Sequence, residues 1–521
     1  MFLNFSDIAN NNLKEFDVCI VGSGPAGLSV ARELNNTNIN VIVLESGSME
    51  PDARYSELNK GISSGPRDLD TQNSRIRCFG GASKIWAGVC RPFSEDDFSE
   101  KSFVPLSGWP ISFKDIEPYY KDASKLLGFK YEDFKNRKWH ASYKTGLAFS
   151  EFKRKDSLLS PMIFQKASVK KRDFSIQFKE LFEKSKNIKI LFNATVVKSI
   201  LNYEKNSISE LQILDINANN SFKIKAKKIV FAAGALENPR LLMLNKDISD
   251  RLNFTGKCFM SHPGFPNASK LIHSKYGECL STPQIESSKS HLLFETNIKT
   301  RFKQSMLRHS IVPVESSVKR QLSAYKNNIN DFSDLFNIVD VIKNVGFWSA
   351  LKSATCYITS EEPRIKVWNL SIGIEQSPNI NSFVSLSSDK DQLGVEKLNI
   401  HWNSLNDIEK HTIKNATNIF SREVGITDLG KTKLSEDLLS EKLYSREDPI
   451  NHHIGTTRMS TSSATGVVDK NCKVFNVNNL YIAGSSVFTT SSMVNPTFTI
   501  IALSLRLGKY LKKSLLMKQN L

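Results

Sequence analysis

The sequence predicts an α/β fold in which a domain with a parallel sheet is interleaved with an α+β domain built on a mixed, largely antiparallel sheet. Residues 16–45 read as strand, glycine turn, helix and strand, which is typical of a βαβ unit. Residues 224–244 and 479–511 again combine an apolar run, a small-residue turn and a helical pattern. Residues 266–446 carry short strand-like segments of another kind, so we expect a second domain there.

The first unit begins with the apolar run FDVCIV and continues through GSGPAG into a helical pattern. Gly22 permits a tight turn, Gly24 lets the backbone approach a pyrophosphate, and Gly27 lets the helix pack on the strand. The helix N-terminus offers free N–H groups and a partial positive charge to the phosphates. Glu45 ends the second strand and can accept hydrogen bonds from ribose hydroxyls. The pattern predicts dinucleotide binding; the alternative is a tight turn with incidental glycines.

The kind of dinucleotide follows from two later strand ends, VFAAGA at 230–235 and LYIAGS at 480–485. Strand ends without bulky side chains let the backbone lie against a flat, extended ligand. The sequence contains no second GxGxxG for a nicotinamide cofactor and no CxxxxC for a disulfide reductase. These features favour FAD over NAD.

The middle of the chain predicts further regular elements. Ser112 is expected to cap a helix that carries Ile116, Tyr120 and Leu126. Antiparallel strands are expected at 269–274, 290–298, 364–377 and 382–388, and helices at 331–342 and 407–424.

Three further segments carry chemically suggestive residues. GGASKIW at 80–86 has two glycines and small side chains that allow a backbone to press on a ring system, although a compact loop explains it equally. NHHIGTTRM contains His452 and His453, and histidine has the pKa that suits proton abstraction near neutral pH. Asn495 and Pro496 are a typical helix N-cap and first residue, and that N-terminus can stabilise an anionic flavin ring.

Together these segments resemble the glucose–methanol–choline (GMC) oxidoreductase family over nearly the whole chain. In the order of that family they are GSGPAG with Glu45, GGASKIW, SGWPI, FAAGALENPRLL, GKCFMSHP, EQSPN, HHIGTTRM and LYIAGSSVFTTSSMVNPTFTI. The variant is most similar to bacterial dehydrogenase-type members that act on sugars or other polyols. The resemblance implies a Rossmann-like FAD-binding domain of three ββα layers at 14–265 and 446–521, and a substrate-binding domain at 266–445.

The resemblance also implies site residues. The family's base falls on His452, its second active-site position falls on Asn495, and His453 stands where the family often has proline and receives no role. Members with covalent flavin carry a histidine where this chain has Ile85, so we expect non-covalent FAD. The residues expected to contact FAD are Gly22, Gly24, Pro25, Ala26, Gly27, Glu45, Ser46, Gly80, Gly81, Ser83, Trp86, Val196, Val197, Ala233, Gly234, Gly484, Ser485, Asn495, Pro496 and Thr497.

The implied reaction oxidises a CH–OH group of a sugar, polyol or other alcohol. His452 takes the hydroxyl proton, the carbinol carbon passes a hydride to flavin N5, and Asn495 bonds the alcohol oxygen. A dehydrogenase is favoured over an oxidase, and O2, a quinone, a cytochrome or a small electron-transfer subunit remain open as acceptors. The alternatives are an FAD enzyme with desaturase or sterol-oxidase chemistry and a flavin-binding subunit without turnover.

Composition indicates which partners and which cellular location to expect for the protein. Seventy basic against 53 acidic residues give a net charge of +17, but the densest basic cluster, 166–172, lacks the interleaved aromatics that favour single-stranded nucleic acid. We therefore expect no nucleic-acid partner. The seven cysteines form no CxxC, so we expect reduced thiols and no metal site. No signal peptide or apolar stretch of 18 residues is present, which predicts a cytoplasmic protein with at most peripheral membrane contact through its amphipathic tail.

Overall fold

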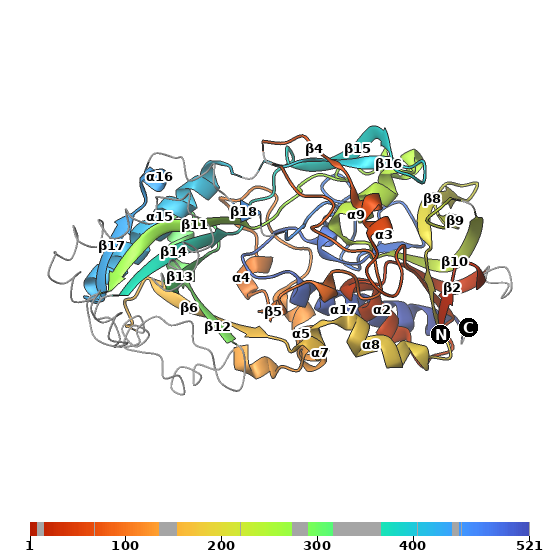
Figure 1. The fold of residues 1–521 in the computed structure, drawn as a ribbon, viewed down its shortest axis with the longest axis horizontal. Coiled ribbons are helices and arrows are strands. Elements are labelled where there is room, and N and C mark those ends of the chain that lie inside the picture. Colours follow the sequence, from red (N-terminus) through yellow and green to blue (C-terminus); the bar gives the residue numbers. More distant parts are fainter. Residues whose placement is uncertain are drawn as a thin grey trace.

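The computed structural model describes residues 1–7, 15–66, 68–134, 154–218, 220–273, 290–315, 366–403, 405–439, 448–449 and 451–519. Figure 1 shows an elongated molecule with one large sheet toward each end. Strands β2 and β10 mark the first sheet, and β11 and β14 mark the second. The architecture confirms the predicted α/β class.

The first sheet is parallel in the order β1-β7-β3-β2-β10, with β19 also paired to β10. These strands are β1 (Phe2–Asn4), β2 (Glu15–Val21), β3 (Val41–Leu44), β7 (Ile188–Phe192), β10 (Ser221–Phe231) and β19 (Leu480–Ile482). All four residues of β3 are apolar and buried, as expected for a strand covered on both faces. The first half of β10 continues into an antiparallel meander with β9 (Ile208–Leu214) and β8 (Thr195–Leu201).

Helices and the meander cover this sheet and produce the predicted three layers (Figure 1). The long helix α17 (Thr497–Gln519) packs against α2 (Pro25–Leu34) and α5 (Phe113–Leu127), and α8 (Phe174–Glu183) contacts α2 and β7. Ser112 is the N-cap of α5, as predicted, and it forms a capping box in which Asp115 accepts from the backbone N–H of Ser112. Shorter helical segments are α3 (Ala53–Ser56), η1 (Glu57–Asn59), η2 (Gly81–Lys84), η3 (Tyr131–Phe134), α7 (Val169–Arg172), α9 (Gly234–Met243), α10 (Lys246–Ser249) and η7 (Ser485–Val487).

The second sheet is antiparallel at every described pairing, in the order β17-β11-β14-β13-β12-β6-β5, with β18 also paired to β11. Its strands are β5 (Val89–Cys90), β6 (Leu159–Lys166), β11 (Pro263–His273), β12 (Ser290–Thr296), β13 (His309–Glu315), β14 (Lys366–Ile374), β17 (Gly430–Leu434) and β18 (Asp448–Pro449). Helix α15 (Asp407–Ile426) packs on it through Ile413, Ala416 and Phe420. A small third sheet joins β15 (Phe383–Lys390), β16 (Glu396–His401) and β4 (Ile62–Ser63).

The predicted strands and the helix at 407–424 are therefore present, while the helix expected at 331–342 lies outside the described residues. The boundaries of the two domains stay a prediction. Strands β5 and β6 belong to the second sheet although they precede residue 266. Within the described residues, no helix is both long and apolar enough to cross a membrane.

A buried network of ion pairs joins the second sheet and α11 (Ile298–Lys303) to α4 (Glu95–Phe98) and the loop after it. Arg308, only 2% exposed, pairs with Asp97 of α4 and with Glu295 of β12. Lys101 pairs with Glu375, which directly follows β14, at 3.2 Å. Removing one partner of such a buried pair leaves an uncompensated charge, so these contacts hold α4 against the second sheet.

Candidate active site

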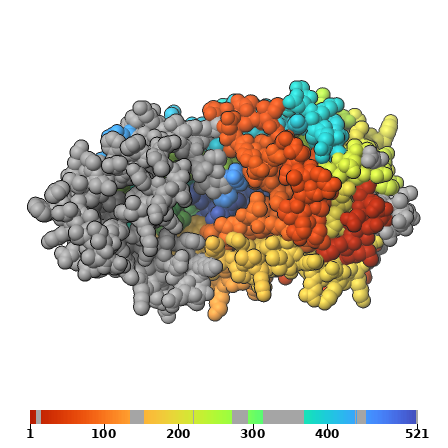
Figure 2. Space-filling model, in the orientation of Figure 1, coloured from red at the N-terminus to blue at the C-terminus, as the bar shows by residue number. Residues whose placement is uncertain are grey.

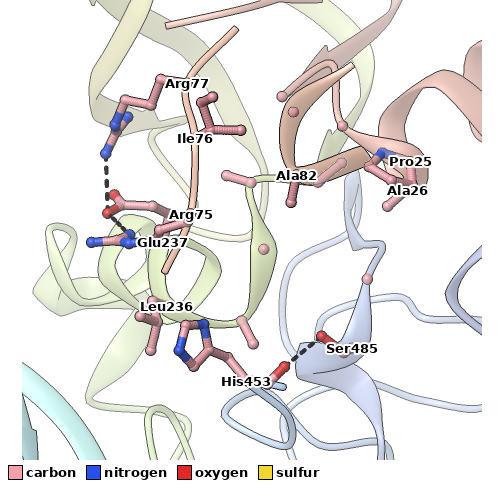
Figure 3. A pocket seen from close by; sticks show the side chains of 18 of the residues that line it. Pro25, Ala26, Arg75, Ile76, Arg77, Ala82, Leu236, Glu237, His453 and Ser485 are labelled. Atoms are coloured by element: carbon pink, nitrogen blue, oxygen red, sulfur yellow. Dashed lines mark hydrogen bonds and ion pairs between the residues drawn. The ribbon is translucent and has the colours of Figure 1, made fainter. Parts of the chain in front are cut away.

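A cavity of about 560 Å³ opens where β2, β3, β10 and β19 end. Parallel α/β sheets bind ligands beyond the carboxyl ends of their strands, so the cavity lies where the glycine motif predicts a cofactor. Figure 2 shows the surface hollowed near the middle of the molecule, with residues of the C-terminal segment visible in blue. Figure 3 shows part of the lining at close range.

Most of the predicted cofactor contacts line this cavity. They are Gly22, Gly24, Pro25, Ala26, Glu45, Ser46, Gly81, Ser83, Trp86, Val196, Ala233, Gly234, Gly484, Ser485, Asn495, Pro496 and Thr497, and His452 lines it as well. Gly27, Gly80 and Val197 do not line it. Val197 packs instead against an apolar cluster that includes Tyr55 and Leu58.

The three glycines of the motif have different structural roles. Gly22 has φ +105°, and a Cβ there would lie 2.6 Å from the carbonyl oxygen of Ala232. A Cβ on Gly27 would lie 2.0 Å from the carbonyl oxygen of Gly22, so this glycine serves helix packing rather than ligand contact. A Cβ on Gly24 would meet no atom within 4 Å. Gly24 therefore leaves open space directly before α2, as a phosphate cradle requires.

Glu45 is 5% exposed and supports the glycine turn as well as lining the cavity. Its carboxylate accepts from the backbone N–H and hydroxyl of Ser23, at 3.0 and 2.6 Å, and from the backbone N–H of Gly47 at 2.9 Å. Burial raises the pKa of Glu45, and the hydrogen bonds from Ser23 and Gly47 oppose that rise. The residue predicted to bind ribose thus also fixes the turn around Ser23.

A cluster of charged residues beside the cavity was not predicted. Arg75, Arg77 and Arg240 all pair with the carboxylate of Glu237, and Figure 3 shows Arg75 and Arg77 directed at it. Burial raises the pKa of Glu237, but the three guanidinium groups outweigh burial and hold the pKa well below its usual range. Arg240 also pairs with Asp391 at 2.7 Å. The three arginines and Glu237 all line the cavity wall. The sequence signal was the alternation Arg-Ile-Arg at 75–77.

The loop at 80–86 lies against the glycine turn. A Cβ on Gly81 would lie 2.9 Å from the Cα of Gly24, so the two backbones are in close contact. The Ser83 hydroxyl donates to the carbonyl of Gly80 at 2.6 Å, and the Trp86 indole N–H donates to the carbonyl of Arg172 at 3.0 Å. Ile85 lines the cavity. These bonds hold the loop in place over the cavity.

The predicted catalytic pair is in contact. Asn495 Nδ2 lies 3.4 Å from His452 Nε2. His452 lies just before the turn at Gly455, and Asn495 lies just before α17. A third residue joins them: His262 Nδ1 lies 2.9 Å from His452 Nδ1. His262 was present in the motif GKCFMSHP but received no role from the sequence. Reciprocal backbone hydrogen bonds between Met260 and Ile454, both 3.0 Å, place the two histidine segments side by side.

Both histidines of this contact are neutral near neutral pH. Burial, followed by the neighbouring His262 and His453, lowers the pKa of His452 well below its usual value. Burial likewise lowers the pKa of His262 to about 4. His453 also lines the cavity, and its carbonyl oxygen accepts from the Ser485 hydroxyl at 2.6 Å (Figure 3). A neutral imidazole beside an amide can accept a proton from a hydroxyl group.

Comparison with known proteins supports the resemblance of the sequence motifs. A family model described as GMC oxidoreductase matches residues 378–504, and one described as FAD binding domain matches residues 15–56. The C-terminal part of the chain is therefore similar to the GMC oxidoreductase family, as the sequence predicts. The cofactor is FAD, which confirms the prediction from the strand ends. The open space at Gly24 fits a bound diphosphate.

Relatives extend over the whole chain. The fructose dehydrogenase large subunit of Gluconobacter japonicus is 22% identical and covers 95% of this chain and 98% of its own. The 2-methyl-1,2-propanediol dehydrogenase of Mycolicibacterium austroafricanum is 19% identical and covers 95% of each chain. A solved structure of formate oxidase from Aspergillus oryzae superimposes with a TM-score of 0.53 at 15% identity, covering 96% of this chain and 98% of that one, which shows a shared fold.

Substitution of Gly24 by valine is expected to weaken FAD binding without unfolding the protein. The backbone at Gly24 has φ −75°, which valine can adopt, and a Cβ there meets no protein atom within 4 Å. We expect the Kd for FAD to rise at least about 10-fold, measured by quenching of flavin fluorescence in apoprotein.

The matched control is Gly425→Val on α15, where a Cβ also meets nothing within 4 Å but no cavity is lined. Both variants should keep the melting temperature of wild-type apoprotein. Wild-type FAD affinity in Gly24→Val would show that this glycine does not face the cofactor.

Proposed function

We propose that the protein oxidises a CH–OH group of a sugar, polyol or other alcohol to a carbonyl, with His452 as the general base. The observation that carries this proposal is the contact of the His452 ring with the Asn495 amide in the cavity wall, with 3.4 Å between Nε2 and Nδ2. The names of the two relatives that span the chain, a fructose dehydrogenase and a propanediol dehydrogenase, support alcohol substrates.

His452 and Asn495 have different roles toward a bound alcohol. His452 Nε2 accepts the hydroxyl proton, because its neutral ring offers a lone pair at that atom. The Asn495 amide donates to the same oxygen and orients it, and the N-terminus of α17 adds a partial positive charge at this wall of the cavity. FAD, when bound, supplies the acceptor for the hydride that leaves the carbinol carbon. Loss of a proton and a hydride converts the alcohol into a carbonyl.

We further propose a dehydrogenase whose electrons pass to a small subunit or cytochrome. The relative from Gluconobacter japonicus is named as a large subunit, and both relatives that span this chain are named dehydrogenases. Because a formate oxidase has the same fold, O2 is the alternative electron acceptor. Readmission of air to the reduced protein separates the two, because an oxidase recovers its flavin absorbance in air within its turnover time.

The variant His452→Ala should reduce its flavin at least about 100-fold more slowly than wild type with the same alcohol, since a positioned base contributes about 100- to 10,000-fold. FAD should remain bound. Anaerobic stopped-flow absorbance measures the rate, and His411→Gln, an exposed histidine on α15, is the control that should match wild type. An unchanged rate of flavin reduction in His452→Ala would show that His452 is not the base.

The pH profile of kcat/KM should be flat from about pH 8 down to pH 6.5, the usual pKa of histidine, and fall only in more acidic solution. The reason is the lowered pKa of His452, caused by burial and then by His262 and His453. Catalysis needs the neutral ring of His452, so a lowered pKa of this ring extends activity to lower pH. An acid limb centred at or above pH 6.5 would contradict the neutral base.

We also propose that FAD is held without a covalent bond, because Ile85 lines the cavity where covalent members of the family carry a histidine. Acid precipitation of the holoprotein should release the flavin into the supernatant. Yellow colour that stays with the washed pellet would demonstrate a covalent link.

A further inference from the structure

We infer that His262 is a positioning residue that fixes the tautomer of His452, so that its unprotonated Nε2 faces the substrate. The inference rests on the proposed function, in which His452 is the base. His262 itself does not line the cavity, so it acts on the reaction only through His452.

The proton positions follow from the partners of His262. Its Nε2 lies 3.2 Å from the backbone carbonyl oxygen of Ser491, which can only accept a hydrogen bond. His262 Nε2 must therefore carry the ring proton. A neutral imidazole has one N–H, so His262 Nδ1 is left as an acceptor.

The same reasoning then fixes His452. Its Nδ1 lies 2.9 Å from the acceptor Nδ1 of His262, so His452 Nδ1 must carry the proton and donate it. His452 Nε2 is left unprotonated, and the donor that faces it, Asn495 Nδ2 at 3.4 Å, agrees with that assignment. The reverse arrangement would place the bare Nε2 of His262 against the Ser491 carbonyl, two acceptors in contact inside the protein.

The geometry suits one hydrogen bond rather than packing of two rings. The ring planes of His262 and His452 are 83° apart with their centroids at 4.9 Å, so the rings meet edge-on. His262 is 1% exposed and cannot exchange this partner for bulk water. A histidine that only filled the core would not need a ring nitrogen directed at the base.

A second set of hydrogen bonds holds His262 and Ser491 in register. Gln376 Oε1 accepts from the backbone N–H of Ser261 at 2.9 Å and from the Trp402 indole N–H at 3.0 Å. The backbone N–H of Gln376 donates to the Ser491 hydroxyl at 3.0 Å, and that hydroxyl donates to the Gln376 carbonyl at 3.1 Å. Gln376 directly follows Glu375, whose carboxylate pairs with Lys101. The residue before His262 and the residue that bonds its Nε2 are thus both held by Gln376.

The direct test is the tautomer of His452 in the FAD-loaded protein. Nitrogen-15 NMR of histidine-labelled protein distinguishes protonated from bare ring nitrogens, and the signals of His452 are those missing from His452→Ala. We expect the Nδ1–H tautomer in wild type, and we expect it to be lost in His262→Leu. The Nε2–H tautomer in wild type would overturn the inference, whether or not any alcohol reduces the flavin.

Two matched variants separate positioning from packing. In His262→Asn the side-chain oxygen takes the place of Nδ1 and can accept from His452, whereas in His262→Gln the amide reaches only the place of Nε2. We expect flavin reduction to slow by roughly 10- to 100-fold in His262→Gln and His262→Leu, at unchanged half-saturating substrate concentration, and to recover most of that loss in His262→Asn.

Equal slowing in the Asn and Gln variants would overturn positioning in favour of packing. If the tautomer is as expected but no alcohol reduces the wild-type flavin, the proposed function fails and the assignment of the proton stands.

Discussion

The architecture depends on close backbone contact where the strands of the first sheet end. Gly22 abuts the carbonyl of Ala232, and Gly27 abuts the carbonyl of Gly22, at distances that exclude any Cβ. Gly455 is equally constrained, since a Cβ there would lie 2.3 Å from the carbonyl of Cys258. The first two contacts shape the cofactor cavity, and the third brings the segment of His452 against the segment of His262. One constraint therefore builds both the cofactor cavity and the contact between His262 and His452.

The candidate active site is assembled from segments of both sheets. His452 and Asn495 belong to segments around the first sheet, whereas His262 directly precedes β11 and Gln376 lies two residues after β14 of the second. The buried ion pairs of Arg308 and Lys101 fix the second sheet against α4 and the loop that follows it. In the proposed arrangement the tautomer of His452 depends on a hydrogen bond across this boundary, so the relative placement of the sheets bears on the proposed chemistry as well as on stability.

Local sequence predicted the parts of the fold that local chemistry determines. The glycine motif and the N-cap at Ser112 are set by neighbours in the chain, and both are present. The predicted terminal helix is present too, although it begins at Thr497, one residue later than predicted. Contacts between distant segments were not predictable. Arg75 with Glu237, and His262 with His452, are separated by 162 and 190 positions. The sequence also did not show which residues face the cavity, since Gly27 and Gly80 serve packing or the turn and Val197 does not line it.

The most direct test of the whole account is an anaerobic titration of the FAD-loaded wild-type protein with a panel of sugars, polyols and simple alcohols. The visible flavin absorbance should bleach with at least one class of alcohol, because a neutral His452 beside Asn495 is built to take a hydroxyl proton. A flavin that dithionite reduces but no member of the panel bleaches would contradict the assignment of CH–OH oxidation to this site.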